Sequence, residues 1–490
     1  MLGAAGPRPS IVSSLVLFPT FTFATFFLFV YGAHVLLRGR PTAWKFVMTA
    51  ASAVFYGWWD VRFLGLIAGS ILFNWWAAMR ADRASARKRK RVVRFAVVTN
   101  LTVLGFFKYW GFFVESLTSA FGNDQPLPFI EVILPVGISF YTFQALSYVI
   151  DVGRRDVRAA PLIDVAVFLS FFPQLVAGPI VRAKEFLPQL RRHRFDDEVD
   201  AFDAAWMIGR GLFKKVVIAT YLADSVVDPV FAAPTEAGKL ELLQAMYGYA
   251  IQIYADFSGY TDIAIGIALL LGFRFPVNFD NPYRSLSIQD FWRRWHITLS
   301  NWLRDYLYIP LGGNRLGSIR TYRNLMVTMI LGGLWHGAAW TFVAWGTLHG
   351  LALVVERLLG IDDGSRSGRI DAVGKTIGQH PIRVAVRWFV TFHIVCVAWV
   401  LFRAETFELA ADFLRGFVTA PIGGGVEWVA VLVIFGALLA QVIPGGAIVV
   451  LRQRMADTDP LLQGAVLGIW IALVVALGPE GVAPFIYFQF

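Results

Sequence analysis

Long apolar runs alternate with short polar loops along the chain, and this pattern predicts helices that cross a bilayer. A helix needs about 20 apolar residues to span the hydrocarbon core. Apolar windows of this kind lie near 11–37, 43–59, 61–79, 92–118, 128–150, 205–232, 240–272, 324–356, 384–402, 427–451 and 462–482. With the two broken stretches described below, we expect an all-α polytopic protein with about 11 to 13 membrane-embedded helices.

Basic residues in the loops predict the orientation of these helices. The loop at 80–94 (RADRASARKRKRVVR) is the strongest basic cluster, and 38–45 (RGRPTAWK) is the next. Cytoplasmic loops of membrane proteins carry an excess of Lys and Arg, so both loops should face the cytoplasm. The loop at 121–128, the amino terminus and the carboxyl terminus are then expected on the outer side. This arrangement predicts a multi-pass protein of the cytoplasmic (inner) membrane.

Two further apolar stretches, 162–181 and 295–312, contain prolines and glycines that break a helix. Basic segments at 151–158 and 181–194 flank the first stretch, and both should be cytoplasmic, so the stretch cannot cross the membrane once. Arginines on both sides of the second stretch pose the same conflict. Broken backbone at membrane depth is tolerated when it is buried in protein or lines a wet cavity. Both stretches are therefore interpreted as re-entrant elements.

Composition supports a membrane protein and narrows its class. Of 490 residues, 57% are hydrophobic and 16% are charged, which is too apolar for a soluble fold of this size. The formal net charge of +10 comes from loops between apolar windows, which points to the positive-inside pattern and away from nucleic acid. The single cysteine, Cys396, excludes an intramolecular disulfide and is interpreted as an inert core residue. The segment 404–417 has helical apolar spacing and is expected along the outer interface.

Two histidines within 289–350 are the first candidates for chemistry, because ionisable side chains are costly at membrane depth. His336 lies in GGLWHGAAW, where small residues allow close approach of a helix or a substrate. A neutral imidazole there can take a proton from an attacking hydroxyl, as acyl transfer requires. The alternatives are a hydrogen-bonded core histidine for His336 and a headgroup-binding side chain for His296. Neither segment offers a third ligand at metal or haem spacing, so no metal site is predicted.

Other polar residues leave a functional and a structural interpretation open. Asp256 and Asp262 lie about 120° apart on one helix, where Gly259 is expected to permit a bend. They can form an ion pathway or make structural hydrogen bonds to neighbouring helices. Arg304 can bind the phosphates of an acyl donor or pair with its neighbour Asp305. There is no Walker A sequence, dinucleotide-binding glycine turn or G-x-S-x-G elbow, so ATP coupling and a serine hydrolase mechanism lack support.

Four stretches resemble the membrane-bound O-acyltransferase family. They are LPVGISFYTFQALSYVIDVGRR at 134–155, FFPQLVAGPIVRAKEFLPQL at 171–190, the long segment 252–315 ending in LRDYLYIPLGGNR, and LGGLWHGAAWTFVAWGTLHG at 331–350. A weaker match, FRAETF, follows at 402–407. The likeness is to the bacterial branch that includes the alginate O-acetylation protein and the D-alanyl transfer protein of teichoic acids.

The resemblance implies a ring of helices around a central tunnel. It implies one acyltransferase domain over 1–490, with a core at about 130–350, preceding helices at 1–127 and following helices at 384–490. The W-H-G histidine of the family, regarded as catalytic, corresponds to His336. A second polar position about forty residues earlier, Asn, Asp or His in different members, corresponds to His296. Candidate donor- or substrate-binding residues are Trp292, Arg304, Asp305, Tyr306, Asn314 and Trp335.

The implied reaction carries an acyl group, most readily acetyl, from a cytoplasmic thioester to a hydroxyl for O-acetylation of an exported polysaccharide such as alginate. The resemblance implies no bound cofactor; acetyl-CoA or an acyl carrier protein would be the co-substrate. An extracytoplasmic SGNH-type acetyltransferase or export machinery is an expected partner, alongside membrane lipid. An ion-coupled transporter or flippase, or a structural export component, is the alternative. The sequence does not identify the acceptor, the acyl group or the oligomeric state. It also leaves open whether the acyl group passes directly to its final acceptor or through a second protein.

Overall fold

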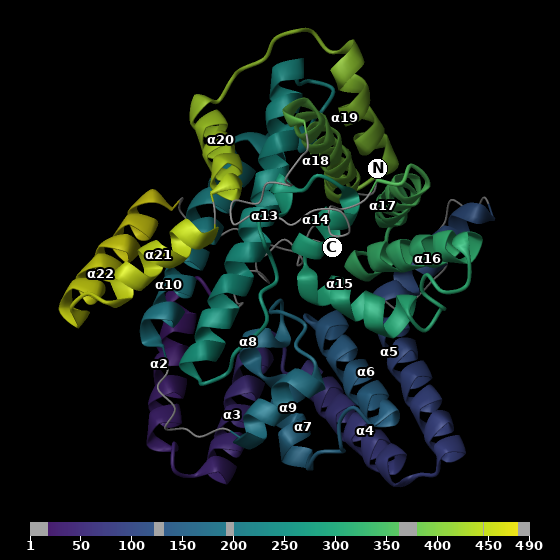
Figure 1. The fold of residues 1–490 in the computed structure, drawn as a ribbon, viewed down its shortest axis with the longest axis vertical. Coiled ribbons are helices and arrows are strands. Elements are labelled where there is room, and N and C mark those ends of the chain that lie inside the picture. Colours follow the sequence, from purple (N-terminus) through teal and green to yellow (C-terminus); the bar gives the residue numbers. More distant parts are fainter. Residues whose placement is uncertain (1–17, 122–131, 193–199, 362–379, 444, 479–490) are drawn as a thin grey trace. The chain divides into compact units, whose positions relative to one another are not determined.

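The computed structural model describes residues 18–121, 132–192, 200–361, 380–443 and 445–478. All regular secondary structure in these ranges is helical, which confirms the predicted all-α class. The chain forms two compact units (Figure 1). The first contains Met1–Ile208 and Tyr260–Pro276, and the second contains Gly209–Gly259 and Val277–Ile486.

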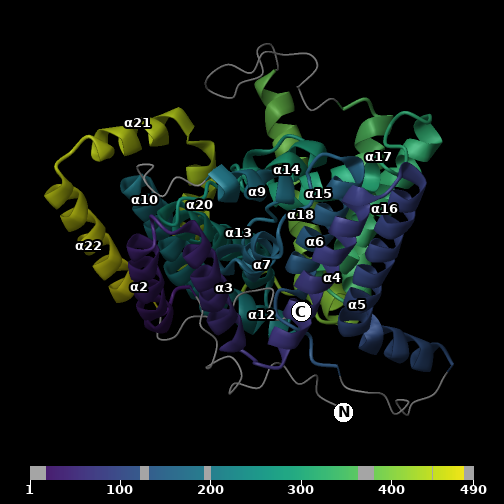
Figure 2. The same ribbon diagram turned by 90° about the horizontal axis from the view of Figure 1, so that it is seen from below.

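The first unit is built mainly from apolar helices that share polar contacts. Its helices are α2 (Phe21–Leu36), α3 (Pro41–Gly57), α4 (Phe63–Arg83), α5 (Ala86–Ala120), α6 (Ile138–Arg154), α7 (Leu162–Ser170), α8 (Phe172–Leu175), α9 (Ala183–Arg192) and most of α10 (Ala201–Leu212). Helices α4, α5 and α6 pack side by side (Figure 2). Reciprocal amide hydrogen bonds of 2.8 and 3.1 Å join Asn100 to Asn74 across α4 and α5. Such paired amides satisfy polar groups that hydrocarbon cannot.

The segment 162–181 is broken, as its prolines and glycines predict. Helix α7 ends at Ser170, the short α8 follows, and the chain is irregular from there until α9 begins at Ala183. Residues 164–183 are all buried. Irregular backbone surrounded by protein is the arrangement that a membrane tolerates. Re-entry from the cytoplasmic side stays a prediction.

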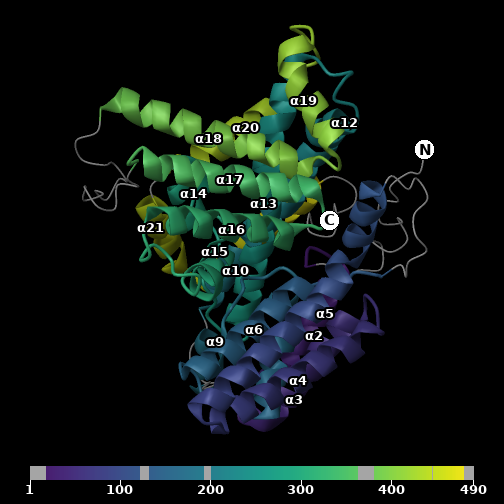
Figure 3. The ribbon, with the colours of Figure 1, turned by 90° about the vertical axis from the view of Figure 1, so that its right-hand side faces the viewer.

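The second unit contains the stretch that holds His296 and His336. Its elements are the π-helices η1 (Phe213–Ala219), η2 (Ala223–Val227) and η4 (Arg304–Tyr308), the 3₁₀-helix η3 (Pro282–Arg284), and α11 (Thr220–Leu222), α12 (Asp228–Ala232), α13 (Lys239–Leu270, whose last turns belong to the first unit), α14 (Ile288–Arg294), α15 (Ile297–Leu303), α16 (Ser318–His336), α17 (Trp340–Leu358), α18 (Pro381–Arg403), α19 (Phe407–Thr419), α20 (Trp428–Val442), α21 (Gly445–Ala456) and α22 (Pro460–Leu477). Helices α16, α17 and α18 run side by side (Figure 3). Helix α19 confirms the helix predicted within 404–417.

Five helices among the described residues are long and apolar enough to cross a membrane: α4, α5, α13, α18 and α22. A bent pair, Trp428–Val442 with Gly446–Ala456, adds a sixth when it is counted as one broken span, and Phe21–Leu36 is a shorter apolar helix. The predicted window at 205–232 is interrupted by the two π-helices η1 and η2. Several of the remaining predicted windows therefore form shorter or broken helices.

The window at 324–356 is two helices, and the single span predicted there is wrong. The backbone is extended at Gly337 and Ala339, directly after His336, so α16 ends and α17 begins. A side chain on Gly333 would overlap the carbonyl oxygen of Phe342, and one on Gly346 would overlap that of Met329. These glycines let the two helices pack as a tight antiparallel hairpin.

Candidate active site

His336 is the last residue of α16 and lies at the turn of this hairpin. Its side chain is buried, with 3% of its surface exposed. Rings from three neighbours meet it edge to face, with centroid distances of 5.1 Å to Trp335, 5.1 Å to Trp345 and 5.3 Å to Phe402. Helix α18 contributes Phe402, so the histidine is enclosed by side chains from α16, α17 and α18. An aromatic enclosure of this kind fixes the ring and limits access of water.

His296 lies at a second break, between α14 and α15. It caps α15 with a left-handed backbone, at φ 43° and ψ 53°, and its side chain is fully buried. A left-handed conformation costs a non-glycine residue about 1 kcal/mol or more. Such conformations concentrate at functional sites, where the surrounding structure holds them in place. Pro310, Gly312 and Gly313 predict the end of the helical stretch after Tyr308, but nothing in the sequence predicts the break at His296.

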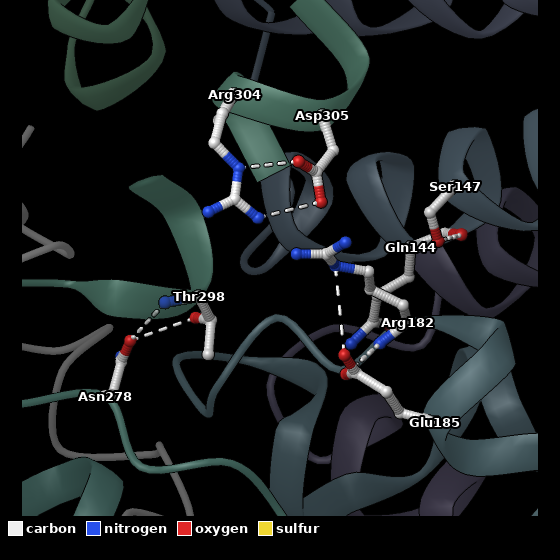
Figure 4. A network of polar contacts seen from close by, with 8 residues as sticks. All are labelled: Gln144, Ser147, Arg182, Glu185, Asn278, Thr298, Arg304 and Asp305. Atoms are coloured by element: carbon white, nitrogen blue, oxygen red, sulfur yellow. Dashed lines mark hydrogen bonds and ion pairs between the residues drawn. The ribbon is translucent and has the colours of Figure 1, made fainter. Parts of the chain in front are cut away.

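Asn278 sets the tautomer of His296. Its Oδ1 accepts hydrogen bonds from the Thr298 backbone N–H at 3.2 Å and from the Thr298 hydroxyl at 2.9 Å (Figure 4). A backbone N–H can only donate, so the atom facing it is the amide oxygen. The same oxygen lies 3.2 Å from Nδ1 of His296. Nδ1 therefore carries the hydrogen and donates it, and the neutral ring keeps its lone pair on Nε2.

The two histidines lie near each other, as the resemblance implies. Their ring centroids are 6.3 Å apart, and Trp335 lies within 5.8 Å of the His296 ring. Nε2 of His296 is buried and has no hydrogen-bond partner among the residues that the structure describes. Buried polar atoms usually have a partner, so one left over marks a place where a polar group can bind. The structure thus places a basic nitrogen close to His336.

A third buried histidine, His349 on α17, lies beside the same aromatic side chains. His296, His336 and His349 are called the histidine cluster below. Trp292 on α14 donates from Nε1 to Nδ1 of His349 at 3.3 Å. Indole nitrogen can only donate, so Nε2 of His349 carries the ring hydrogen, and it has no acceptor in the described part of the chain. Trp345 lies between this ring and His336, at centroid distances of 4.8 and 5.1 Å. The cluster therefore contains one buried acceptor and one buried donor besides His336.

Sequence reasoning singled out neither Asn278 nor His349. His349 stands in apolar sequence and meets the same criterion that identified the other two histidines. Asn278 lies in an irregular segment, and its role depends on contacts with Thr298 and His296 that only the folded chain provides.

The residues proposed to bind phosphate lie on η4 and the following turn. Arg304 donates to both carboxylate oxygens of Asp305, at 2.7 and 3.2 Å (Figure 4). This is the internal pairing that the sequence leaves open. The Arg304 side chain is 56% exposed. Tyr306 is buried, whereas Asn314 is exposed. The turn beside Asn314 is held by Asn324 of α16, whose amide donates to the carbonyl groups of Leu311 and Gly313 at 3.2 and 3.0 Å.

The two aspartates on α13 occupy different surroundings. Asp256 forms a buried ion pair with Lys215 of η1 within the second unit. Asp262 is buried in the part of α13 that belongs to the first unit. Helix α13 runs without interruption from Lys239 to Leu270, so Gly259 does not break it, and the bend expected there stays a prediction. The missing side chain of Gly259 allows the end of α10 and the start of η1 to approach, since a Cβ there would lie 2.8 Å from the carbonyl oxygen of Gly211 and 3.0 Å from the backbone nitrogen of Lys215.

Substitutions at Asn278 test whether its hydrogen bond fixes the tautomer of His296. Asn278→Ala leaves the Thr298 N–H unpaired at a cost of about 1–3 kcal/mol, and it frees the His296 ring to change tautomer. We expect acyl transfer to fall about ten-fold or more in this variant. Asn278→Asp keeps an acceptor at the same place and should retain more activity than Asn278→Ala. Thr298→Val loses only the hydroxyl bond, worth about 1 kcal/mol, and serves as the matched control. Equal activity of the two Asn278 variants would contradict the assignment.

Comparison with known proteins now bears on this cluster. The family model of the membrane-bound O-acyltransferases matches residues 97–360, which include all three histidines. The chain is 46% identical over 371 residues to the probable alginate O-acetylase of Azotobacter vinelandii, covering 74% of this chain and 70% of the relative. It is 37% identical to the peptidoglycan O-acetyltransferase of Helicobacter pylori, covering 84% and 82%. It is 30% identical to the teichoic acid D-alanyltransferase of Streptococcus thermophilus, covering 54% and 68%.

The family match spans more than half of the chain, and the relatives align over most of their own length. The matched residues include the hairpin that presents His336 and the break that presents His296. The chain therefore belongs to the membrane-bound O-acyltransferase family, and it is a multi-pass membrane protein with O-acyltransferase activity.

Proposed function

We propose that this enzyme transfers an acetyl group from a cytoplasmic thioester to a hydroxyl group, with His336 as the general base. The observation that carries the proposal is the buried pair formed by His336 and His296, whose rings lie 6.3 Å apart inside an aromatic enclosure. A general base acts across about 3 Å, so one reacting hydroxyl between the rings can meet both. The names of the alginate and peptidoglycan relatives support acetyl as the group transferred.

The reaction needs one proton carrier and one positioning group. His336 takes the proton of the acceptor hydroxyl while the oxygen of that hydroxyl forms a bond to the carbonyl carbon of the thioester. The carbon–sulfur bond then breaks, and the imidazolium of His336 returns the proton to the leaving thiolate. The carbonyl groups at the end of a helix carry partial negative charge, so the position of His336 at the end of α16 stabilises the imidazolium. No other co-reactant is required.

His296 is proposed to position the acceptor. Its Nε2 lone pair, fixed by the contact with Asn278, can accept a hydrogen bond from a bound hydroxyl. His349 offers the opposite function, because its Nε2–H can donate to an oxygen. The hydroxyl that receives the acyl group can donate its hydrogen to His296, and the carbonyl oxygen of the thioester can accept a hydrogen bond from His349. The histidine cluster is therefore complementary to both reactants.

Substitutions at His296 separate its chemistry from its backbone. Asparagine tolerates the left-handed conformation better than other side chains, and alanine does not. We expect His296→Asn to melt at or above the temperature of His296→Ala, and to keep more activity because its amide can still accept a hydrogen bond. Thermal unfolding in detergent, together with the rate of acetyl transfer, measures both effects. A His296→Ala enzyme as active as wild type would exclude the positioning role.

The donor, acceptor and partners form part of the same proposal. Acetyl-CoA or an acetylated carrier protein would present the thioester from the cytoplasm, and the acyl group would leave through a tunnel on the outer side. Relatives named for alginate, peptidoglycan and teichoic acid support an exported polymer as the final acceptor. A polymer far from the bilayer needs a carrier of the acetyl group, and an SGNH-type acetyltransferase fits that task. Both termini are expected on the outer side of the inner membrane.

The proposal is tested by expressing the full chain in an alginate-secreting bacterium that lacks its own O-acetylase. Alkali-labile acetate on purified alginate and on purified peptidoglycan is measured by proton NMR. We expect acetate to return on one of the two polymers. If neither polymer gains acetate while the chain is present in the membrane, the proposed acceptor class is wrong.

A further inference from the structure

An open hollow in the first unit lies between α4 and α5 and is lined by aromatic, aliphatic and cationic side chains. It has a volume of about 730 Å³ and is lined by the rings of Trp75 and Trp76, by aliphatic side chains, and by the cations Arg80, Arg83 and Lys88. No acidic residue is among the described residues that line it. The hollow lies where α4 ends and α5 begins, beside the basic loop. Figure 3 shows the two helices side by side.

The three cations are available to a ligand. In the part of the chain that the structure describes, none of Arg80, Arg83 and Lys88 has an ion pair. The neighbouring carboxylate, Asp82, is engaged with Arg158 at 3.5 Å. Arg80 lies over the ring of Trp76 at 5.9 Å, a contact that leaves its N–H groups free to bind an anion. Three cations without a carboxylate favour a phosphate-bearing ligand.

Apolar stripes lead away from the hollow along both helices. On α4, Leu72, Trp76 and Arg80 are spaced four residues apart and share one face. On α5, Lys88, Val92 and Phe95 do the same at spacings of four and three residues. Leu72 and Phe95 are 52% and 55% exposed, although both lie on helices apolar enough to cross a membrane. Each helix therefore runs from a cation that lines the hollow into an exposed apolar surface.

We propose that this hollow binds one anionic phospholipid of the cytoplasmic leaflet. Its phosphate would lie among Arg80, Arg83 and Lys88, and its acyl chains along the stripes that contain Leu72 and Phe95. Nε1 of Trp75 is buried and has no hydrogen-bond partner among the described residues. In the proposed complex it would donate to an ester or glycerol oxygen of the lipid. The exposed apolar stripes favour a phospholipid over a free phosphate or a nucleotide, because only the phospholipid has acyl chains that can cover them. The site does not depend on the proposed acetyl transfer.

Native mass spectrometry of the full chain in detergent tests the site with two lipids of identical acyl chains, phosphatidylglycerol and phosphatidylcholine. Wild type should retain one phosphatidylglycerol and bind phosphatidylcholine more weakly. The triple variant Arg80→Gln, Arg83→Gln, Lys88→Gln should bind phosphatidylglycerol at least about ten-fold more weakly. Equal retention of the two lipids by wild type would overturn the selectivity for anions. Displacement of phosphatidylglycerol by free coenzyme A would assign the phosphate site to a nucleotide and overturn the lipid proposal.

The matched control combines Arg87→Gln, Lys90→Gln and Arg91→Gln, which remove equal charge from exposed positions of α5 outside the hollow. This control should bind the lipid as wild type does, and equal weakening in both triple variants would show a diffuse charge effect and overturn the site. If the first triple variant fails to fold, Arg83→Gln and Lys88→Gln are measured singly against Arg87→Gln, with the same outcomes. Melting temperatures without added lipid establish that each variant is folded.

Discussion

Replacing His336 with Ala is expected to lower acetyl transfer by about 10² to 10⁴-fold, the usual contribution of a general base. The side chain lies at the end of a helix, enclosed by rings and 6.3 Å from His296, so its loss removes the proposed general base without breaking a helix. Initial rates in washed membranes, normalised to the amount of inserted protein, give the comparison. A rate within a few-fold of wild type would exclude His336 as the base.

His393→Ala is the matched control for this experiment. His393 lies on α18, is half-buried, and bonds to the Tyr247 hydroxyl at 2.7 Å and the Phe389 carbonyl at 2.7 Å. Replacing His393 with alanine removes its hydrogen bonds, but it leaves the three residues of the histidine cluster unchanged. We expect His393→Ala to keep near-normal rates with a modestly lowered melting temperature.

Gly333→Ala is expected to destabilise the α16–α17 hairpin by about 1–3 kcal/mol or more, because overpacking forces backbones apart. The new methyl group would overlap the carbonyl oxygen of Phe342, and that backbone cannot move without shifting the turn that carries His336. We therefore expect a lower melting temperature and a large loss of transfer together. The measurement is thermal unfolding in detergent, paired with initial rates.

Gly436→Ala on α20 serves as the control for this effect. A Cβ on Gly436 meets nothing within 4 Å. Alanine is favoured over glycine inside a helix by about 0.5–1 kcal/mol, so this variant should be unchanged or slightly more stable. A Gly333→Ala protein as stable and as active as Gly436→Ala would show that the tight hairpin is not required.

The apolar pattern predicts most helices of the chain, but it does not reveal where one of them turns back. The windows near 43–59, 61–79 and 384–402 correspond to α3, α4 and α18. The window at 324–356 divides at Gly337, because hydropathy is the same for one long span and for two packed helices. The glycines that permit the hairpin are visible in the sequence, yet the carbonyl groups that they approach are defined only by the fold.

The candidate site shows the same division. Polar residues in apolar sequence identify His336 and His296, and the family resemblance predicts that they act together; the fold places them 6.3 Å apart. The tautomer of His296 depends on Asn278, which belongs to no motif that a single sequence reveals. His349 also stands in apolar sequence and meets the same criterion. Which residues come together in the site depends on tertiary contacts, and these cannot be read from the local pattern of a single sequence.

The most direct test of transfer across the membrane uses purified protein in proteoliposomes. Coenzyme A carrying a labelled acetyl group is sealed on the face bearing the basic loops. A hydroxyl acceptor, such as short alginate chains together with the proposed extracytoplasmic acetyltransferase, is supplied on the other face. We expect label to appear across the membrane as an alkali-labile ester with wild type and His393→Ala, and to be lost with His336→Ala. Equal labelling by His336→Ala, or labelling only when donor and acceptor share one side, would contradict this expectation.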